Sequence, residues 1–215
     1  MSLADRLHAG AQALGLALTG AQEQALLGYL DLLGKWNRVY NLTAVREPSE
    51  MLSHHLLDSL SVVGPLRRHT GSAPASVLDV GSGGGLPGAV IAICCPELRV
   101  DCLDAVGKKA AFVQQAAATL GLANLRGLHG RVESVRDPYD VVTSRAFASL
   151  ADFVAGSRQA RAEQGVWLAM KGKRPDEEIA ALPADIAVFH VEPLNVPDLA
   201  ADRCLVWMRP AAPNR

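Results

Sequence analysis

Residues 76–94 constrain the fold more than any other stretch of this sequence. Residues 76–80 predict a short buried strand, a run of glycines follows it, and residues 86–94 predict a helix that is apolar on nearly every side. A helix of this kind packs against a sheet. The strand, the tight glycine turn and the buried helix together predict a place where a ligand approaches bare backbone.

Strand-like and helix-like segments alternate from Ser76 to the end of the chain. The predicted strands span 76–80, 98–103, 124–129, 139–144, 165–170, 186–191 and 203–209. This alternation predicts an α/β fold with a mostly parallel sheet that helices cover on both faces. With 49% hydrophobic residues among 215, the chain can bury one substantial core.

The N-terminal part of the chain is predicted to be helical. The expected helices span 3–16, 20–36 and 48–63, with Pro48 near the start of the third. Thr19 is a plausible cap for the second helix. Glycine, serine and proline make 69–75 the best linker, so we expect a helical region over 1–70 and an α/β domain over 71–215.

The glycine turn alone leaves the ligand open, because Gly83, Gly85 and Gly88 also satisfy the dinucleotide fingerprint G-x-G-x-x-G. Asp79 opposes that interpretation, since a carboxylate about 4 Å from a pyrophosphate costs on the order of 4 kcal/mol at an effective dielectric near 20. It favours an ammonium or a sulfonium instead. Pro87, expected in the first turn of the helix, removes one N–H that would hold a phosphate. A cationic, phosphate-free nucleoside satisfies both observations, and S-adenosylmethionine is the common one.

Asp104 follows the second predicted strand and has two readings. An acidic residue at this strand end is placed to accept both ribose hydroxyls of an adenosine-type ligand. Alternatively, it caps the predicted helix over 107–120, where Asp is common. We favour the ribose contact.

Composition excludes several classes of protein. Glycine, proline or charge interrupts each apolar run well before the length that a bilayer requires, and no signal peptide is evident. Cys94 and Cys95 are adjacent, and the chain has no C-x-x-C pair, which suits neither a disulfide framework nor a zinc site. We therefore expect buried, reduced thiols in a cytoplasmic protein without a membrane segment or a bound metal.

The net charge of −1 argues mildly against nucleic acid, but the basic residues gather locally. The clusters comprise Lys35, Arg38 and Arg46, then Arg67 and Arg68, then Arg145, and finally Lys171, Lys173 and Arg174. Such runs are usually solvated faces, so this pattern permits RNA without requiring it.

Five short motifs, in this order, carry a resemblance to a known family. They are Lys-Trp-Asn-Arg-Val-Tyr-Asn-Leu-Thr at 35–43, His-His-Leu-Leu-Asp-Ser-Leu at 54–60, the glycine loop through Leu86-Pro87-Gly88, Ser-Arg-Ala-Phe-Ala-Ser-Leu at 144–150, and Lys171-Gly172. From about Ala21 to the last strand, the sequence resembles the bacterial 16S rRNA guanine-N7 methyltransferases, also called glucose-inhibited division protein B. The resemblance implies a class I, Rossmann-like methyltransferase with a seven-stranded, mostly parallel sheet and a helical N-terminal extension. It also implies transfer from S-adenosylmethionine to N7 of a guanine in the decoding-region loop of 16S rRNA.

The resemblance also implies roles for individual residues. Gly81 and Leu86 match glycine-loop contacts, Val132 and Glu133 match a segment that lies against adenine, and Arg145 matches a position at the mouth of the active site. With the strand-end and loop residues, the predicted cofactor-binding set is Asp79, Gly81, Gly83, Leu86, Asp104, Val132, Glu133 and Arg145. One departure from the family is Gly84, where many relatives have proline, so this loop is expected to be more flexible.

Arg145 and Lys171 are the candidates for holding the guanine or its phosphates. Arg145 follows a predicted strand, at the sheet edge where ligands bind, although a salt bridge that stabilises the loop is the alternative. N7 of neutral guanine carries a lone pair and no proton, so transfer needs positioning rather than a general base. If Arg145 contacts the base, it must leave N7 free, which favours O6 or a phosphate.

Three further expectations concern residues outside the predicted cofactor site. His54 and Asp58 lie one helical turn apart, and we expect a hydrogen-bonded pair that fixes the third helix, rather than a metal site. Trp36 is expected to be mainly core packing. The basic residues Lys35, Arg38 and Arg46, with Lys171, Lys173 and Arg174, are expected to form one surface on the side of the cofactor pocket.

Two alternative functions remain at this point. A small-molecule methyltransferase would keep the glycine loop and Asp104 without a basic surface, and a Rossmann oxidoreductase would need the dinucleotide reading. We expect 16S rRNA or the small ribosomal subunit as the partner of a monomeric enzyme.

Overall fold

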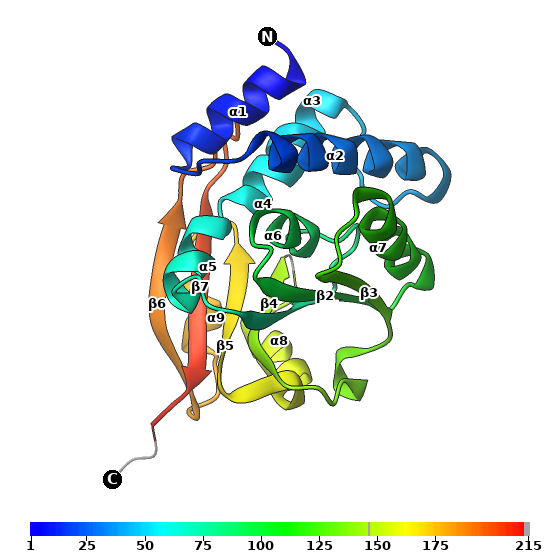
Figure 1. Cartoon of the computed structure of the whole chain (residues 1–215). Coiled ribbons are helices and arrows are strands. Elements are labelled where there is room, and N and C mark those ends of the chain that lie inside the picture. The colour runs from blue at the N-terminus through cyan, green and yellow to red at the C-terminus, as the bar shows by residue number, and fades with distance from the viewer. Residues whose placement is uncertain (146, 213–215) are drawn as a thin grey trace.

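A seven-stranded sheet forms the centre of the structure, a computed structural model that describes residues 1–145 and 147–212 (Figure 1). The strands are β1 (Ala75–Val80), β2 (Leu98–Asp104), β3 (Leu125–His129), β4 (Tyr139–Arg145), β5 (Arg161–Lys171), β6 (Ile186–Leu194) and β7 (Arg203–Pro210). They follow the order β3-β2-β1-β4-β5-β7-β6. The pairs among β1 to β5 are parallel, and β7 runs antiparallel to both β5 and β6. All seven predicted strands and the mostly parallel sheet are confirmed.

The strand order reverses beside β1, which pairs with β2 on one side and β4 on the other. In open sheets of this type, the crevice at the carboxyl ends of such neighbouring strands is where ligands bind. The glycine turn follows β1 directly, so the topology places it at that crevice.

Helices cover both faces of the sheet, as Figure 1 shows. One face carries α1 (Leu3–Ala13), α2 (Gly20–Tyr40), α5 (Val63–Thr70), α6 (Gly88–Cys94) and α7 (Gly107–Leu120). The opposite face carries α8 (Leu150–Ser157) and α9 (Asp176–Ala180). Neighbouring residues of β1 point to opposite sides, since Val77 belongs to the first core and Leu78 to the second.

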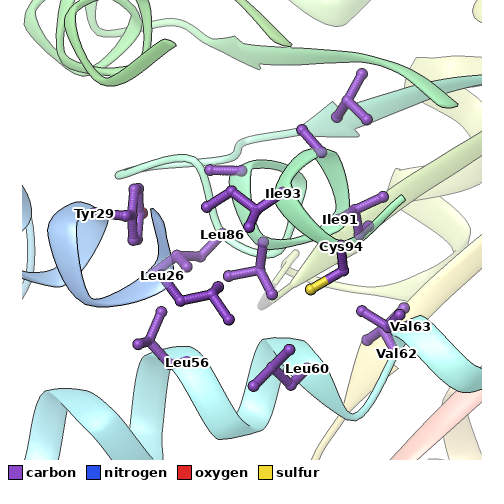
Figure 2. Close-up of a cluster of buried hydrophobic side chains, with 14 of the residues drawn as sticks. Leu26, Tyr29, Leu56, Leu60, Val62, Val63, Leu86, Ile91, Ile93 and Cys94 are labelled. Carbon is purple, nitrogen blue, oxygen red and sulfur yellow. The ribbon is translucent and has the colours of Figure 1, made fainter. Parts of the chain in front are cut away.

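The helices before β1 and the sheet share one core. In Figure 2, Leu26 and Tyr29 of α2 face Leu86, and Leu56 and Leu60 lie across from α6. Every residue of α6 is buried, as its apolar sequence predicted. The helical region therefore packs as a layer on the sheet, and the boundary between 1–70 and 71–215 stays a prediction.

The predicted cap of α2 is confirmed, because the Thr19 hydroxyl accepts a hydrogen bond from the Gln22 N–H at 3.2 Å. The helix runs beyond the predicted residue 36 to Tyr40 and ends at Asn41, whose φ of 50° is left-handed. The helix α1 ends early, at Ala13, before Gly15 at a φ of 71°.

The prediction of one regular helix over 48–63 is wrong in its detail. The segment comprises α3 (Pro48–Met51), a π-helical stretch Leu52–Leu57 and α4 (Asp58–Leu60), and α5 then continues to Thr70. Nearly every side chain from 51 to 63 is buried, so the apolar spacing defines no single face from which the helical period could be read. The connection to β1 accordingly starts at Gly71, later than the predicted 69.

None of the helices in the described part of the chain combines the length and the apolarity that a membrane span requires.

Candidate functional site

The glycine loop has a backbone conformation that would strain a residue with a side chain. Gly81, Gly83 and Gly85 have φ angles of 66°, 59° and 83°, in the left-handed region that glycine enters without strain. The N–H groups of Gly81 and Ser82 both donate to the carbonyl of Leu103, at 2.9 and 3.1 Å. These contacts fix the start of the loop to the end of β2.

Asp79 lies beneath this loop and is fully buried. Its Oδ2 accepts a hydrogen bond from the Gly88 N–H at 2.8 Å, at the start of α6. Burial raises the pKa of Asp79 to about 7. Its Oδ1 is buried and has no hydrogen-bond partner among the described residues. The predicted contact of Asp79 with a ligand stays a prediction.

Pro87 precedes the first turn of α6 rather than lying in it, which corrects the prediction by one residue. The helix begins at Gly88, whose N–H is taken by Asp79. A Cβ at Gly88 would meet the Cys102 sulfur at 2.3 Å, so this close approach of helix to sheet requires glycine.

Asp104 joins the glycine loop to the end of β2. Its Oδ2 accepts from the Gly83 N–H at 2.9 Å, and its Oδ1 accepts from the Val106 N–H at 2.8 Å. The alternative prediction, that Asp104 caps the helix, is wrong, because Val106 is the residue before α7 and no side chain caps that helix. Each carboxylate oxygen can accept more than one hydrogen bond, so Asp104 keeps acceptor capacity toward a ligand.

A cavity of about 210 Å³ opens beside Asp104, at the carboxyl ends of β1, β2 and β3. It is lined by Val80, Gly81, Leu103, Asp104, Ala105, Gly130, Arg131, Val132, Glu133 and Phe147. The structure thus brings together Gly81, Asp104, Val132 and Glu133, which the sequence predicted from three separate segments. Larger cavities of about 900 and 490 Å³ lie elsewhere, and neither is lined by the glycine loop.

Leu86 and Gly83 do not line this cavity. The Leu86 side chain is 4% exposed and packs into the core beside Leu26 and Tyr29 (Figure 2). Gly83 contributes through its N–H to Asp104. A backbone contact from either residue to a ligand stays a prediction.

Gly84 is held by two side chains of α2. The Tyr29 hydroxyl donates to the Gly84 carbonyl, and a Cβ on Gly84 would meet the Leu33 side chain at 2.9 Å. The contact from Tyr29 restrains the loop at the position where the sequence led us to expect more flexibility.

Arg145 ends β4 and reaches the helical layer. Its Nη1 donates to the His54 carbonyl at 3.0 Å and to Oδ2 of Asp58 at 3.1 Å. The ion pair that we gave as the alternative for Arg145 therefore exists, and it leaves part of the guanidinium exposed.

Asp58 also accepts a hydrogen bond from Arg203, whose Nε lies 2.8 Å from Oδ1. Asp58 fixes its helix on the sheet, as predicted, but its partners are these arginines and not His54. The His54 ring instead lies 3.1 Å from the Glu50 carbonyl. Sequence reasoning missed Arg203, because no local motif links it to a residue 145 positions away.

Lys171 ends β5, and its Nζ lies 2.8 and 3.0 Å from the Glu178 carboxylate oxygens. The same ammonium lies 3.4 Å from the carbonyl of Phe147, whose side chain lines the cavity. Arg145 and Lys171 lie at the carboxyl ends of adjacent strands, because Arg145 of β4 pairs with Met170, the residue before Lys171 in β5. Neither residue lines the cavity itself, and their predicted contact with the acceptor stays a prediction.

The other basic residues are partly paired. Lys35 contacts Asp31 at 2.6 Å, Arg174 contacts Asp176 at 2.6 Å, and Arg46 donates to Asn41 at 3.1 Å. A common basic surface stays a prediction.

Trp36 packs against Phe112 of α7, with ring centroids 5.5 Å apart. Its predicted packing role is confirmed.

The four cysteines are buried thiols without a disulfide. Across residues 1–145 and 147–212, no group of three or more His, Cys, Asp and Glu side chains is arranged to hold a metal ion.

Comparisons with known proteins point in one direction. The family model for the rRNA small subunit methyltransferase G matches residues 22–206. A protein of Acidovorax ebreus (strain TPSY) named ribosomal RNA small subunit methyltransferase G is 65% identical, over 98% of this chain and 97% of that protein. One of the same name from Polaromonas naphthalenivorans (strain CJ2) is 56% identical, over 98% and 97% of the respective chains.

Solved structures show the same fold at low sequence identity. TrmN from Thermus thermophilus superimposes with a TM-score of 0.56 at 17% identity, over 74% of this chain and 53% of that one. A SAM-dependent methyltransferase from Aquifex aeolicus gives a TM-score of 0.54 at 16% identity, over 75% and 98%. The sheet is thus that of class I, Rossmann-like methyltransferases.

Proposed function

The chain belongs to the rRNA small subunit methyltransferase G family, and we propose that it transfers the methyl group of S-adenosylmethionine to N7 of a guanine in 16S rRNA. Family membership supports the rRNA substrate, and the small-molecule alternative is not favoured. The observation that carries the proposal is the cavity at the ends of β1, β2 and β3, where Gly81 and Asp104 meet Val132 and Glu133.

The residues of this cavity suit S-adenosylmethionine. No atom lies within 4 Å of the place where a Cβ of Gly81 would stand, so bare backbone faces open space. Asp104 and Glu133 line the cavity with one cation, Arg131, and two carboxylates oppose a pyrophosphate. A nucleoside without phosphates and with a positive charge fits this lining, whereas a dinucleotide does not.

We assign the cofactor contacts by element. Asp104, at the end of β2, accepts hydrogen bonds from the ribose hydroxyls, and the Gly81 backbone borders the methionine part of the cofactor. Val132 packs on the adenine ring, and Glu133 beside it accepts a hydrogen bond from the adenine amino group. Asp79 and Gly83 act on the cofactor through the shape of the loop, since their hydrogen bonds go to Gly88 and Asp104.

When bound, the cofactor supplies an electrophilic methyl group on a sulfonium. Because guanine N7 offers a lone pair and no proton, this chain needs no general base and contributes by holding the guanine in line with the methyl group. Positioning of this kind can supply roughly 7–11 kcal/mol. Arg145 and Lys171, on adjacent strand ends beside Phe147, hold guanine O6 or neighbouring phosphates and leave N7 free.

The proposal is tested by incubating the protein with radiolabelled S-adenosylmethionine and one of three acceptors: naked 16S rRNA, assembled small subunits, or a metabolite pool. We expect label in the RNA of the first or second reaction, from a monomeric enzyme acting in the cytoplasm. Label that enters only the metabolite pool would overturn the RNA assignment.

A further inference from the structure

Asp58 is a buried carboxylate that accepts hydrogen bonds from two arginines. The residue is 2% exposed. Arg145 of β4 donates to Oδ2 at 3.1 Å, and Arg203 of β7 donates to Oδ1 at 2.8 Å. One guanidinium is enough to neutralise one carboxylate, so the trio carries a surplus positive charge at the edge of the sheet.

Both arginines keep donors that this trio does not use. Arg145 uses only Nη1, toward Asp58 and the His54 carbonyl. Arg203 uses Nε toward Asp58 and Nη1 toward the Asp202 carbonyl. Within the described parts of the chain, Nη2 of each arginine has no protein partner. Each side chain is 24% exposed, so these donors are not sealed in the core.

The trio lies on the same sheet edge as the cofactor cavity. The strand β5 pairs with β4 on one side and with β7 on the other, and its Lys171 stands opposite Cys204, next to Arg203. Phe147, two residues after Arg145, lines the cofactor cavity. Arg203 lines the separate hollow of about 900 Å³ together with Arg174, and Asp202 is the acidic residue of that lining.

Two guanidinium groups anchored on one carboxylate suit a phosphodiester. Guanidinium presents its N–H groups in a planar fork that matches phosphate oxygens, and a buried carboxylate behind it fixes the direction of that fork. A lone surface arginine would have to lose side-chain freedom on binding, whereas these two are already held.

We propose that Arg145 and Arg203 together bind one phosphodiester of the rRNA beside the target guanine, and that Asp58 positions both guanidinium groups. This inference rests on the proposed function, because it assigns Arg145 to the phosphate rather than to the base. It adds Arg203 and Asp58 to the acceptor site.

The variant Arg203→Gln separates binding from folding. Glutamine carries its amide nitrogen at the same number of bonds from the backbone as arginine Nε, so it keeps a donor for Asp58 and deletes both Nη groups. We expect unchanged thermal stability and S-adenosylmethionine affinity. The KM for the rRNA substrate should rise about tenfold, as for a lost charge-assisted hydrogen bond.

Salt dependence identifies the lost contact as a phosphate. For Arg203→Gln, the slope of log(kcat/KM) for RNA against log salt should become shallower by about 0.7, the value for one phosphate contact on a single strand. Arg158→Ala is the matched control, because Arg158 is an ion-paired arginine near the amino end of β5, at the opposite edge. That control should keep both the KM and the slope.

Asp58→Asn tests the positioning role. Both positive charges remain, so the salt slope should persist while the KM for RNA rises. If Asp58 only holds the helix on the sheet, the variant loses thermal stability but keeps its KM for RNA, and this result contradicts the positioning role. If Asp58→Asn does not fold, the inference is tested by Arg203→Gln alone. A wild-type KM and slope in Arg203→Gln overturn the inference, whereas a wild-type protein that methylates no rRNA overturns the proposed function.

Discussion

The carboxylate of Asp104 accepts a hydrogen bond from the backbone N–H of Gly83 at 2.9 Å, across the crevice between β2 and the glycine loop. Its other oxygen holds the Val106 N–H at 2.8 Å. One side chain therefore shapes the loop and lines the cavity to which we assign the cofactor.

Replacing Asp104 should damage cofactor binding much more than it damages the fold. Asp104→Ala removes two backbone contacts and the proposed ribose acceptor, so we expect the Kd for S-adenosylmethionine to rise at least tenfold, about 1.4 kcal/mol or more. Calorimetric titration measures this. Asp140→Ala is the control, because Asp140 also accepts a backbone N–H, from Ser76 at 2.7 Å, at the other edge of the sheet. Equal affinities in the two variants would contradict the assignment.

Gly81→Asp should abolish cofactor binding through the cavity rather than through strain. Gly81 has a φ of 66°, and Gly71, at the end of α5, has a φ of 61°; neither has an atom within 4 Å of the place of a Cβ. Substitution at either site therefore carries a similar backbone strain of about 1–2 kcal/mol. Only Gly81 borders the cavity. We expect Gly71→Asp to bind S-adenosylmethionine normally, and a similar loss in both variants would refute the placement.

Gly88→Ala should destabilise the protein. The added methyl group would stand 2.3 Å from the Cys102 sulfur and 3.0 Å from Oδ2 of Asp79, in a fully buried site. Overpacking of this kind typically costs about 1–3 kcal/mol. Gly34→Ala, in the middle of α2 with no atom within 4 Å, should instead stabilise by about 0.5–1 kcal/mol. Urea unfolding of the two variants tests these opposite signs.

Asp79 should make stability depend on pH. Burial raises the pKa of its carboxyl from 3.8 to about 7 in the folded protein, so between these values the folded chain holds a proton that the unfolded chain has lost. The stability contributed by this group is therefore full below about pH 4 and is lost as the pH rises through 7, by a few kcal/mol.

His55 acts in the opposite direction, which determines how the Asp79 effect must be measured. Burial lowers the pKa of His55 from 6.5 to about 4, so its contribution is lost as the pH falls through that range. The useful quantity is the difference in unfolding free energy between the wild-type protein and Asp79→Asn, in which the His55 effect cancels. We expect the unfolding free energy of the wild type, relative to that of Asp79→Asn, to fall as the pH rises from about 5 to 8. A constant difference would show that Asp79 is ionised throughout.

The strands could be predicted from the sequence because short apolar runs alternate with glycine, proline and charge. The glycine loop and Asp104 could be placed because strand ends in a parallel sheet meet at one edge. The π-helical stretch at Leu52–Leu57 could not be predicted, since all of its residues except His54 are buried and no single apolar face marks its period. The same stretch leaves the His54 ring beside the Glu50 carbonyl, away from the predicted partner Asp58.

The partners of Asp58 could not be predicted from the sequence for a different reason. Arg145 and Arg203 lie 87 and 145 positions away along the chain, and only the order of β4, β5 and β7 in the sheet brings them together. Sequence reasoning could identify Arg145 from its place after a strand. It had no signal that would join Arg203 to it.

The position of the transferred methyl group can be determined by identifying the methylated nucleoside. After incubation of 16S rRNA or assembled small subunits with S-adenosylmethionine and the wild-type protein, the RNA is digested and its nucleosides are identified by mass spectrometry. We expect N7-methylguanosine at one site, formed by the wild type and by Gly71→Asp but not by Gly81→Asp. A methyl group on another atom or base, or equal product from Gly81→Asp, would contradict this expectation.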